Sequence, residues 1–155
     1  MPSPSTTLRD EYDSMTSLLD LLKQEQQCLV SADTDGLTAI TPRKSELITR
    51  MAALASQRHQ SLALSGHLAN DGGMDAWLPA GGDAAASSLW QELLAHTRSA
   101  KELNRVNGML IAKHMAHNQT VLNAMRTPSG GATAGFYGPN GQATGTGASR
   151  RFVVG

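Results

Sequence analysis

The sequence predicts an all-α protein: an elongated antiparallel three-helix bundle or coiled coil with a long C-terminal helix and a disordered Gly-rich tail. Aromatic residues are few, with two each of Trp, Tyr and Phe, whereas β-strands favour aromatic and β-branched side chains. Apolar residues recur at alternating spacings of four and three, which is the heptad pattern of helices that pack on one another. The end of the chain is rich in Gly and has no acidic residue, a composition that cannot bury enough apolar area to order itself.

The first helix is predicted over about residues 7–31. Thr7 and Asp10 resemble a capping box at its start. Leu18 and Leu21 widen its apolar stripe, so we expect this helix to contact two neighbours. Its heptad positions are Leu8, Tyr12, Met15, Leu19, Leu22, Gln26 and Leu29.

The second helix is predicted over residues 34–65, with Asp33 as its N-cap and Gly66 as its C-cap. Pro42 lies inside this range, although Pro is best tolerated in the first turn of a helix. We therefore expect Thr41 to cap a restart or a kink, and the pattern leaves open whether the helix is kinked or split. The heptad positions are Leu37, Ile40, Lys44, Leu47, Met51, Leu54 and Arg58.

A third helix is predicted over residues 84–126, after a loop at 66–83 that is dense in Gly, Asp and Pro. Asp83 is the expected N-cap, and Trp77 is expected to pin the loop to the helices. The heptad positions are Leu93, His96, Ala100, Leu103, Asn107, Leu110, His114, His117 and Val121.

The Asn107-Gly108 pair is a strong hairpin signal, yet the heptad pattern continues through it and no period-two pattern flanks it. We therefore predict a continuous helix. Gly108 then indicates either close approach of another backbone or a point where the helix bends. Asn107 is a polar residue at a heptad position, which fixes helix register at a cost in stability. Asn104, Asn107 and Gly108 are the candidates for register or close packing.

Composition limits the function classes. The chain has 155 residues and no net charge, which suits one helical domain over residues 1–126 and a flexible tail over 127–155. Its single Cys28 excludes an intramolecular disulfide and a cysteine zinc cluster. The start lacks a signal-peptide pattern and no apolar run could span a bilayer, so we expect a cytoplasmic protein without stable membrane insertion. Basic residues are too few, with too few aromatic partners, for nucleic-acid binding.

No nucleophile–base–acid arrangement and no phosphate-binding loop is visible, so we expect neither an enzyme nor a cofactor. His114 and His117 lie three residues apart on one helix face, a spacing that metal sites use. The nearest acid on that helix is Glu102, about three turns away. A helical-bundle metal-binding protein is therefore the weaker alternative.

The second half of the third helix carries apolar and Met side chains, which are either core or an exposed docking surface for partner helices. The helix is longer than its neighbours, which favours exposure. Phe136 and Tyr137 form an aromatic island in the tail, which is either a chance feature or a short docking motif.

Four stretches resemble the FlgN family of flagellar export chaperones: "LLKQEQQCLVSADTDGL", "RKSELITRMAAL", "LNRVNGMLI" and the tail "FYGPNGQ". Together they span most of residues 8–142, and the Asn104–Asn107-Gly108 arrangement is the most specific part of the resemblance. The resemblance implies a cytoplasmic chaperone of type III flagellar export. Such a protein binds the helical terminal segment of hook-associated (hook–filament junction) proteins, prevents their premature assembly and delivers them to the export gate.

The resemblance also implies which residues act. It places the client-binding surface on the C-terminal helix, at Leu110, Ile111, His114, Val121, Leu122 and Met125. It places docking to the cytoplasmic domain of the export gate on the tail, at Phe136, Tyr137 and Gly138. A generic coiled-coil adaptor, or a secretion chaperone of another system, remains the alternative of the same class. The sequence leaves open whether the third helix pairs with a second copy in a homodimer.

Overall fold

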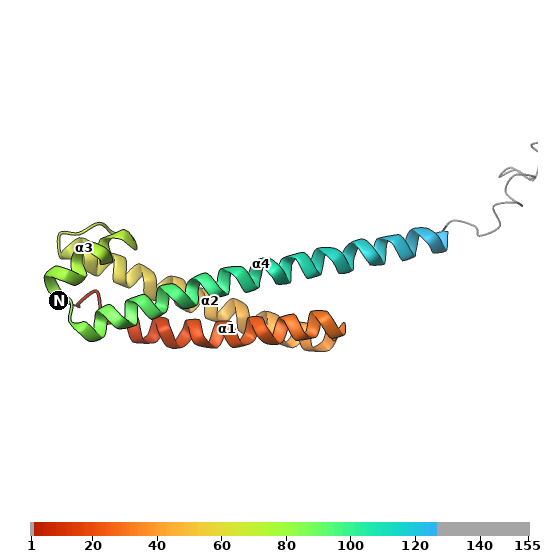
Figure 1. Ribbon diagram of the computed structural model, residues 1–155, viewed down its shortest axis with the longest axis horizontal. Helices are drawn as coiled ribbons and strands as arrows, with labels where there is room; N and C mark the ends of the chain where they lie inside the picture. Colours follow the sequence, from red (N-terminus) through yellow and green to blue (C-terminus); the bar gives the residue numbers. More distant parts are fainter. Residues whose placement is uncertain (1, 127–155) are drawn as a thin grey trace, which may run out of the picture. The chain divides into compact units, whose positions relative to one another are not determined.

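The computed structural model describes residues 2–126, which form four α-helices and no strand: α1 (Leu8–Ser31), α2 (Thr34–Leu64), α3 (Gly72–Gly81) and α4 (Ala84–Arg126) (Figure 1). The chain divides into two compact units, Met1–Ile111 and Ala112–Gly155, with the boundary inside α4. The predicted all-α class is confirmed over the described residues. The predicted Gly-rich tail at 127–155 lies outside them.

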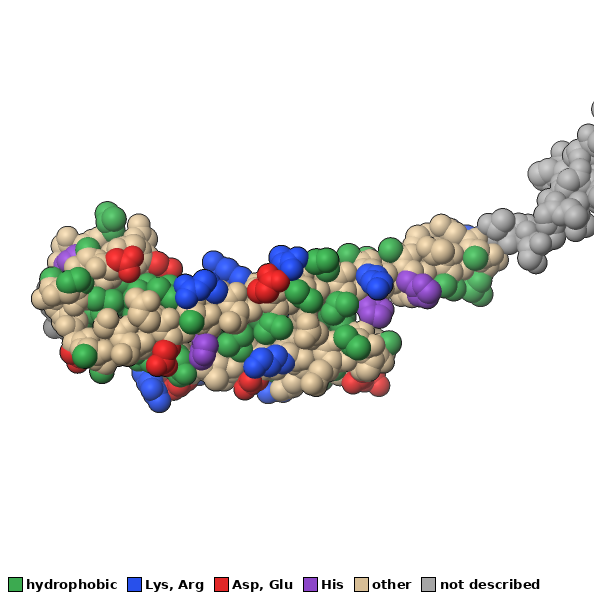
Figure 2. All heavy atoms as spheres, viewed as in Figure 1, with side chains coloured by type: hydrophobic (Ala, Val, Ile, Leu, Met, Phe, Trp, Pro, Cys, Tyr) green, Lys and Arg blue, Asp and Glu red, His purple; other side chains and the backbone are tan. Residues whose placement is uncertain are grey.

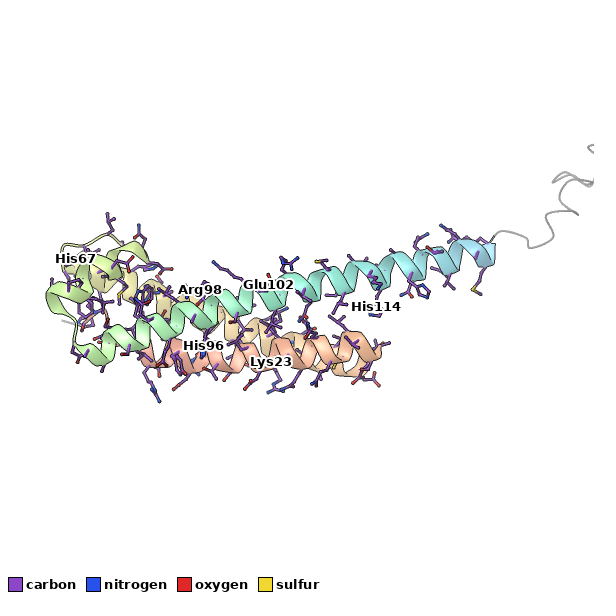
Figure 3. All side chains as sticks on the ribbon, in the orientation of Figure 1. Lys23, His67, His96, Arg98, Glu102 and His114 are labelled. Carbon is purple, nitrogen blue, oxygen red and sulfur yellow. The ribbon has the colours of Figure 1, made fainter. Side chains whose placement is uncertain are left out.

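Three long helices build the first unit. Ion pairs between α1 and α2 join Glu11 to Arg58 and Glu25 to Lys44, so the two helices run antiparallel. The side chain of Asn107 in α4 donates to the Leu22 carbonyl of α1. His96 of α4, which is labelled in Figure 3, stacks on Tyr12 of α1, with ring centroids 5.0 Å apart. Helix α1 therefore contacts two neighbours, as its wide apolar stripe predicts.

The hydrophobic core of this unit follows the predicted heptads of α1. It is built from Leu, Met and Trp side chains with little exposed area. The core residues are Leu8, Met15, Leu18, Leu19, Leu22, Leu62, Met74, Trp77, Ala86, Trp90, Leu93 and Ala100.

Most helix ends follow the predicted capping. The Asp33 carboxylate accepts from the Gly36 amide at 2.9 Å, and the Asp83 carboxylate accepts from the Ala86 amide at 2.7 Å. The C-cap of α2 is Ser65, and the predicted C-cap Gly66 follows it in a left-handed conformation with φ 81°. The capping box at Thr7 was a wrong prediction, because the Thr7 hydroxyl donates to the buried Glu11 carboxylate and makes no capping bond.

The predicted loop at 66–83 contains a short helix, α3, so this part of the prediction was wrong. Its Gly and Pro residues favour turns, but α3 buries Met74 completely and leaves Trp77 only 7% exposed. This burial stabilises a helix that local propensity does not favour. The expectation that Trp77 pins the segment to the bundle is confirmed.

Helix α2 is continuous through Pro42, so it is not split there. Thr41 does not cap a restart, because its hydroxyl donates to the Leu37 carbonyl at 2.9 Å. Pro42 has no amide hydrogen to donate to the carbonyl of Thr38, four residues earlier in the helix.

No helix within residues 2–126 combines the length and the hydropathy that a membrane span requires.

Candidate functional site

The second half of α4 carries apolar side chains that the described part of the chain leaves exposed. Ile111, in the first unit, is 42% exposed and Leu110 beside it is half-buried. In the second unit, Met115 is 66%, Leu122 51% and Met125 78% exposed. Hydrophobic side chains are visible on the surface of this helix in Figure 2. Within the described chain, the exposed residues of this group are therefore not core residues, whereas Leu110 is partly covered. The predicted heptad contacts end before His117 and Val121, which are exposed.

The exposed residues of the second unit share one side of the helix. At about 100° per residue, the side chains of Met115, Leu122 and Met125 fall within an arc of about 80°. Val121 and the half-buried His114 widen this arc to about 120°. An apolar stripe of this width is typical of a helix that packs on another helix. We call the predicted residues of the second unit, His114, Val121, Leu122 and Met125, the α4 apolar face; the other two predicted residues, Leu110 and Ile111, belong to the first unit.

A polar layer with a buried centre joins the three long helices at one end of the first unit. Asn107 is 1% exposed, and its amide donates to Glu25 Oε1 at 2.9 Å. Lys44 donates to Glu25 at 3.2 Å and to Asn104 Oδ1 at 3.1 Å. We call Glu25, Lys44, Asn104 and Asn107 the asparagine layer. These contacts support the register role that the sequence predicts for the two Asn residues.

The surroundings of Gly108 differ from those that one of its two interpretations predicts. A Cβ atom built on Gly108 would have no atom of the described residues within 4 Å, apart from its chain neighbours and the nearby backbone of its own helix. Close approach of another backbone from the described part of the chain is therefore a wrong interpretation of Gly108. The bend interpretation stays a prediction.

A second buried polar layer lies near α3. Arg58 is 3% exposed, and its guanidinium donates to both Glu11 oxygens and to Asp71 Oδ1 at 3.0–3.3 Å. The guanidinium also lies 4.7 Å from the centre of the Trp90 ring. Burial alone would lower the pKa of Arg58, but hydrogen bonds and charge from Glu11 and Asp71 raise it. We call Glu11, Arg58, Asp71 and Trp90 the arginine layer.

Neither ion pair was predicted from the sequence, although the sequence contains a signal for both. Lys44 and Arg58 are charged residues at heptad positions of α2, and they lie two heptads apart. Glu11 and Glu25 of α1 have the same separation. Equal spacing of acids and bases on two antiparallel helices predicts two ion pairs in one register.

The predicted metal alternative concerns His114 and His117. Within residues 2–126, no group of three or more His, Cys, Asp or Glu side chains is placed to hold a metal ion. His114 is half-buried and His117 is exposed on α4. The predicted gate-docking residues Phe136, Tyr137 and Gly138 lie outside the described residues.

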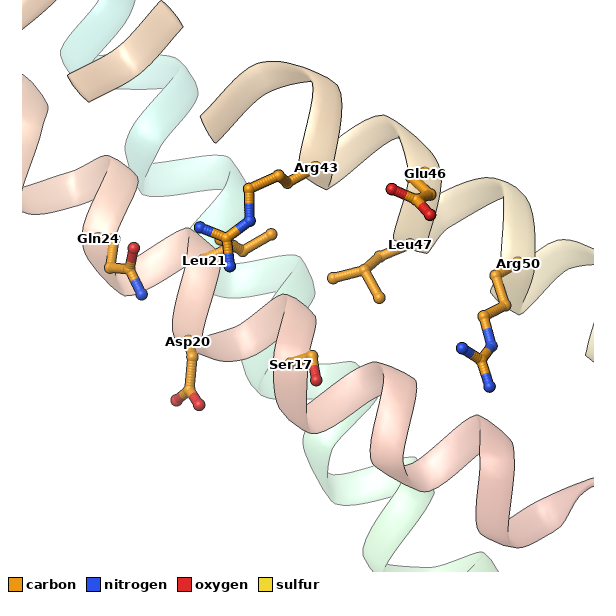
Figure 4. Close-up of a pocket in the computed structure, with 8 residues that line it drawn as sticks. All are labelled: Ser17, Asp20, Leu21, Gln24, Arg43, Glu46, Leu47 and Arg50. Atoms are coloured by element: carbon orange, nitrogen blue, oxygen red, sulfur yellow. The ribbon is translucent and has the colours of Figure 1, made fainter. Parts of the chain in front are cut away.

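A hollow of about 380 Å³ lies between α1 and α2 (Figure 4). Arg43 and Arg50 of α2 and Asp20 of α1 line it, together with Glu46, Ser17, Gln24 and two Leu residues. The charges at this hollow are of both signs, which gives no preference for an anion or a cation.

Comparison with known proteins identifies the chain. The model of the FlgN protein family matches residues 1–145. The chain belongs to the FlgN family. This is a family of flagellar chaperones and not of enzymes.

Individual FlgN relatives match over nearly the whole chain. The flagella synthesis protein FlgN of Yersinia enterocolitica is 28% identical over 142 residues, which are 90% of this chain and 88% of the relative. The protein of the same name from Escherichia coli is 29% identical over 147 residues, with 91% and 93% coverage. That of Salmonella typhimurium is 30% identical over 143 residues, with 88% and 90% coverage. No solved structure matches the chain.

Proposed function

We propose that this chain is a cytoplasmic flagellar export chaperone for hook-associated proteins. It binds the helical terminal segment of its client, prevents premature assembly and delivers the client to the type III export gate. Family membership supports the flagellar role, and the α4 apolar face supports the mode of binding. An exposed apolar helix face is suited to an amphipathic client helix, which covers it by helix-on-helix packing.

The exposure of Leu122 and Met125 is the observation that carries this proposal. Leu122 is 51% and Met125 is 78% exposed, although both side chains are fully apolar. Large apolar side chains on one side of a helix mark an interaction surface. A client helix that covers them removes this area from water, which supplies the main free energy of binding.

Leu122→Asp tests the proposal. A buried charge opposite an apolar client helix is expected to weaken binding at least about thirtyfold, as loss of a central contact does. Thr120→Asp is the matched control, because it adds the same charge on the other side of the same helix turn. Isothermal titration with a purified hook-associated protein measures both affinities, and circular dichroism measures helicity. Equal affinities for the two variants, or loss of helicity in Leu122→Asp, would argue against the α4 apolar face.

The tail supplies the proposed contact with the export gate. Phe136, Tyr137 and Gly138 are carried over from the family resemblance, and a short separable motif suits a transient handover. Tyr137→Ala is expected to weaken binding to the cytoplasmic domain of the gate and to leave client affinity unchanged. Unchanged gate affinity would remove Tyr137 from the mechanism.

A further inference from the structure

An apolar groove runs between α2 and α4, with α1 as its floor, entirely within the first unit. Two hollows, of about 250 Å³ and about 200 Å³, share Met15, Met51 and Thr97 and are therefore continuous. The apolar lining comes mainly from Leu18, Leu22, Ile48, Ala100, Leu93 and Leu94. All of these residues precede the second unit, and none belongs to the α4 apolar face.

The side chains at the floor of the groove are buried, whereas those at its α2 edge are accessible to solvent. Leu18 and Leu22 on the floor are 6% and 1% exposed. Ile48 at the edge is 47% exposed, and Met51 is half-buried. Three helices with an open apolar groove between two of them leave the fourth position of a four-helix bundle vacant. A helix is the element whose side chains interdigitate with such a groove.

The groove ends at the two polar layers, and their charges have opposite sign. At the arginine layer, the carboxylates of Glu11 and Asp71 face the single guanidinium of Arg58. The layer therefore carries one net negative charge while the His59 imidazole, 3.0 Å from Asp71 Oδ1, is neutral, and this charge lies on the exposed Asp71 carboxylate. At the asparagine layer, Glu25 offsets the charge of Lys44. Lys101 lines the groove at this end and makes no hydrogen bond or ion pair with a described residue, so it remains as a positive charge.

We infer that the groove binds one amphipathic helix of a partner protein, with a basic N-terminal turn beside Asp71 and an acidic C-terminal turn beside Lys101. The bound helix would run antiparallel to α2, and its macrodipole favours the same direction as its end charges. Along α4 the groove extends from Trp90 to Asn104, about 21 Å at about 1.5 Å per residue, so about four helical turns fill it. This inference goes beyond the proposed function, because it concerns other residues and holds whether or not the α4 apolar face binds a client.

Two synthetic peptides test the inference with the full chain. Both have the same length of about 18 residues and the same apolar stripe at i, i+3, i+4 and i+7. The matched peptide has Lys in its first turn and Glu in its last turn, and the swapped peptide has these charges exchanged. Amide chemical shifts of the isotope-labelled chain report the site and the affinity. A nitroxide at the N-terminus of the matched peptide reports its direction.

The matched peptide is expected to shift groove amides such as those of Thr97 and Ala100. After correction for the helicity of each free peptide, which circular dichroism measures because its end charges act on its own macrodipole, the matched peptide is expected to bind about tenfold more tightly than the swapped peptide. Its nitroxide is expected to broaden amides near Asp71 and not those near Asn104. Ile48→Asp is expected to remove the binding, whereas Leu122→Asp, at a similarly exposed residue, leaves it intact.

Three results would overturn the inference. The first is absence of groove shifts with either peptide at about 1 mM. The second is equal affinity for the two peptides after correction for the helicity of each free peptide. The third is binding that Leu122→Asp removes and Ile48→Asp keeps, which would assign the peptide to the α4 apolar face.

Discussion

At the residue scale, two ion pairs, one buried and one partly buried, hold α1 and α2 in one register. Arg58 and Glu11 are 3% and 5% exposed, so both charges are removed from water. A buried pair of this kind adds little stability relative to apolar residues, but losing one partner leaves an uncompensated buried charge. The main effect of the pairs is therefore to disfavour other registers of α1 against α2, in which these charges would lose their partners.

Glu11→Gln is expected to lower the free energy of unfolding by about 3 kcal/mol, because it leaves the Arg58 guanidinium buried without its main counter-charge. Urea unfolding followed by circular dichroism measures the change. Asp13→Asn is the matched control, because its partner Arg9 is exposed at the surface and the loss there should stay below about 0.5 kcal/mol. A loss below about 1 kcal/mol for Glu11→Gln would contradict the role assigned to this pair.

Asp71 gives the first unit an acid-sensitive contact. Burial alone would raise the pKa of Asp71, but hydrogen bonds from His59 and Arg58 lower it. A carboxyl group with a lowered pKa contributes stability that is present above its unfolded pKa of about 4 and is lost as the pH falls through its folded pKa. The stabilisation by Asp71 should therefore be complete at neutral pH and disappear in acid.

Asp71→Asn should therefore reduce the stability lost between about pH 6 and about pH 3. The measurement is the urea midpoint of both proteins at the two pH values. The wild type should lose more stability than the variant over this range. An equal loss in both proteins would mean that Asp71 is not coupled to folding.

At the element scale, α4 passes through Gly108 without a packing reason for Gly. Gly108→Ala is expected to stabilise the protein by about 1 kcal/mol, because an exposed helix interior favours Ala and a Cβ meets open space there. Gly73→Ala in α3 is the opposite case, because its Cβ would collide with the Leu68 carbonyl. Thermal unfolding measures both. If Gly108→Ala destabilises the protein instead, the added Cβ atom clashes with a neighbour that the described residues do not show, and this prediction is wrong.

The sequence predicts the long helices well because their signals are local. Asp33 and Asp83 are side-chain caps, and heptads mark the stretches between them. α3 was not predicted, because its Gly and Pro residues favour turns locally, whereas Met74 and Trp77 stabilise it through contacts distant in sequence. The α2–α4 groove likewise has no local sequence signature, because it depends on the spacing between helices that are distant in the sequence.

For the candidate site, the sequence predicts which residues of α4 are apolar but not whether they are covered. The heptad positions of α4 are buried at Leu93, Ala100 and Asn107, and exposed at His117 and Val121. The same pattern therefore describes a core segment and an exposed segment. Helix length relative to its neighbours was the only signal that favoured exposure.

At the scale of the whole molecule, the first unit has a core, two polar layers and a groove, whereas the described part of the second unit is a single helix with an apolar side. A lone helix obtains most of its stability from packing on a partner. This requirement supports a client helix, or a second copy of the chain, as the cover for the α4 apolar face.

The most direct test of the proposed chaperone role is size-exclusion chromatography with light scattering. The purified chain is run alone, then with a hook-associated protein, then with that protein lacking its terminal helical segment. A stoichiometric complex that requires the terminal segment is the predicted result, and the run without client gives the oligomeric state. A folded, helical sample that forms no complex at about 50 µM, or one that binds the truncated client equally well, would contradict the account.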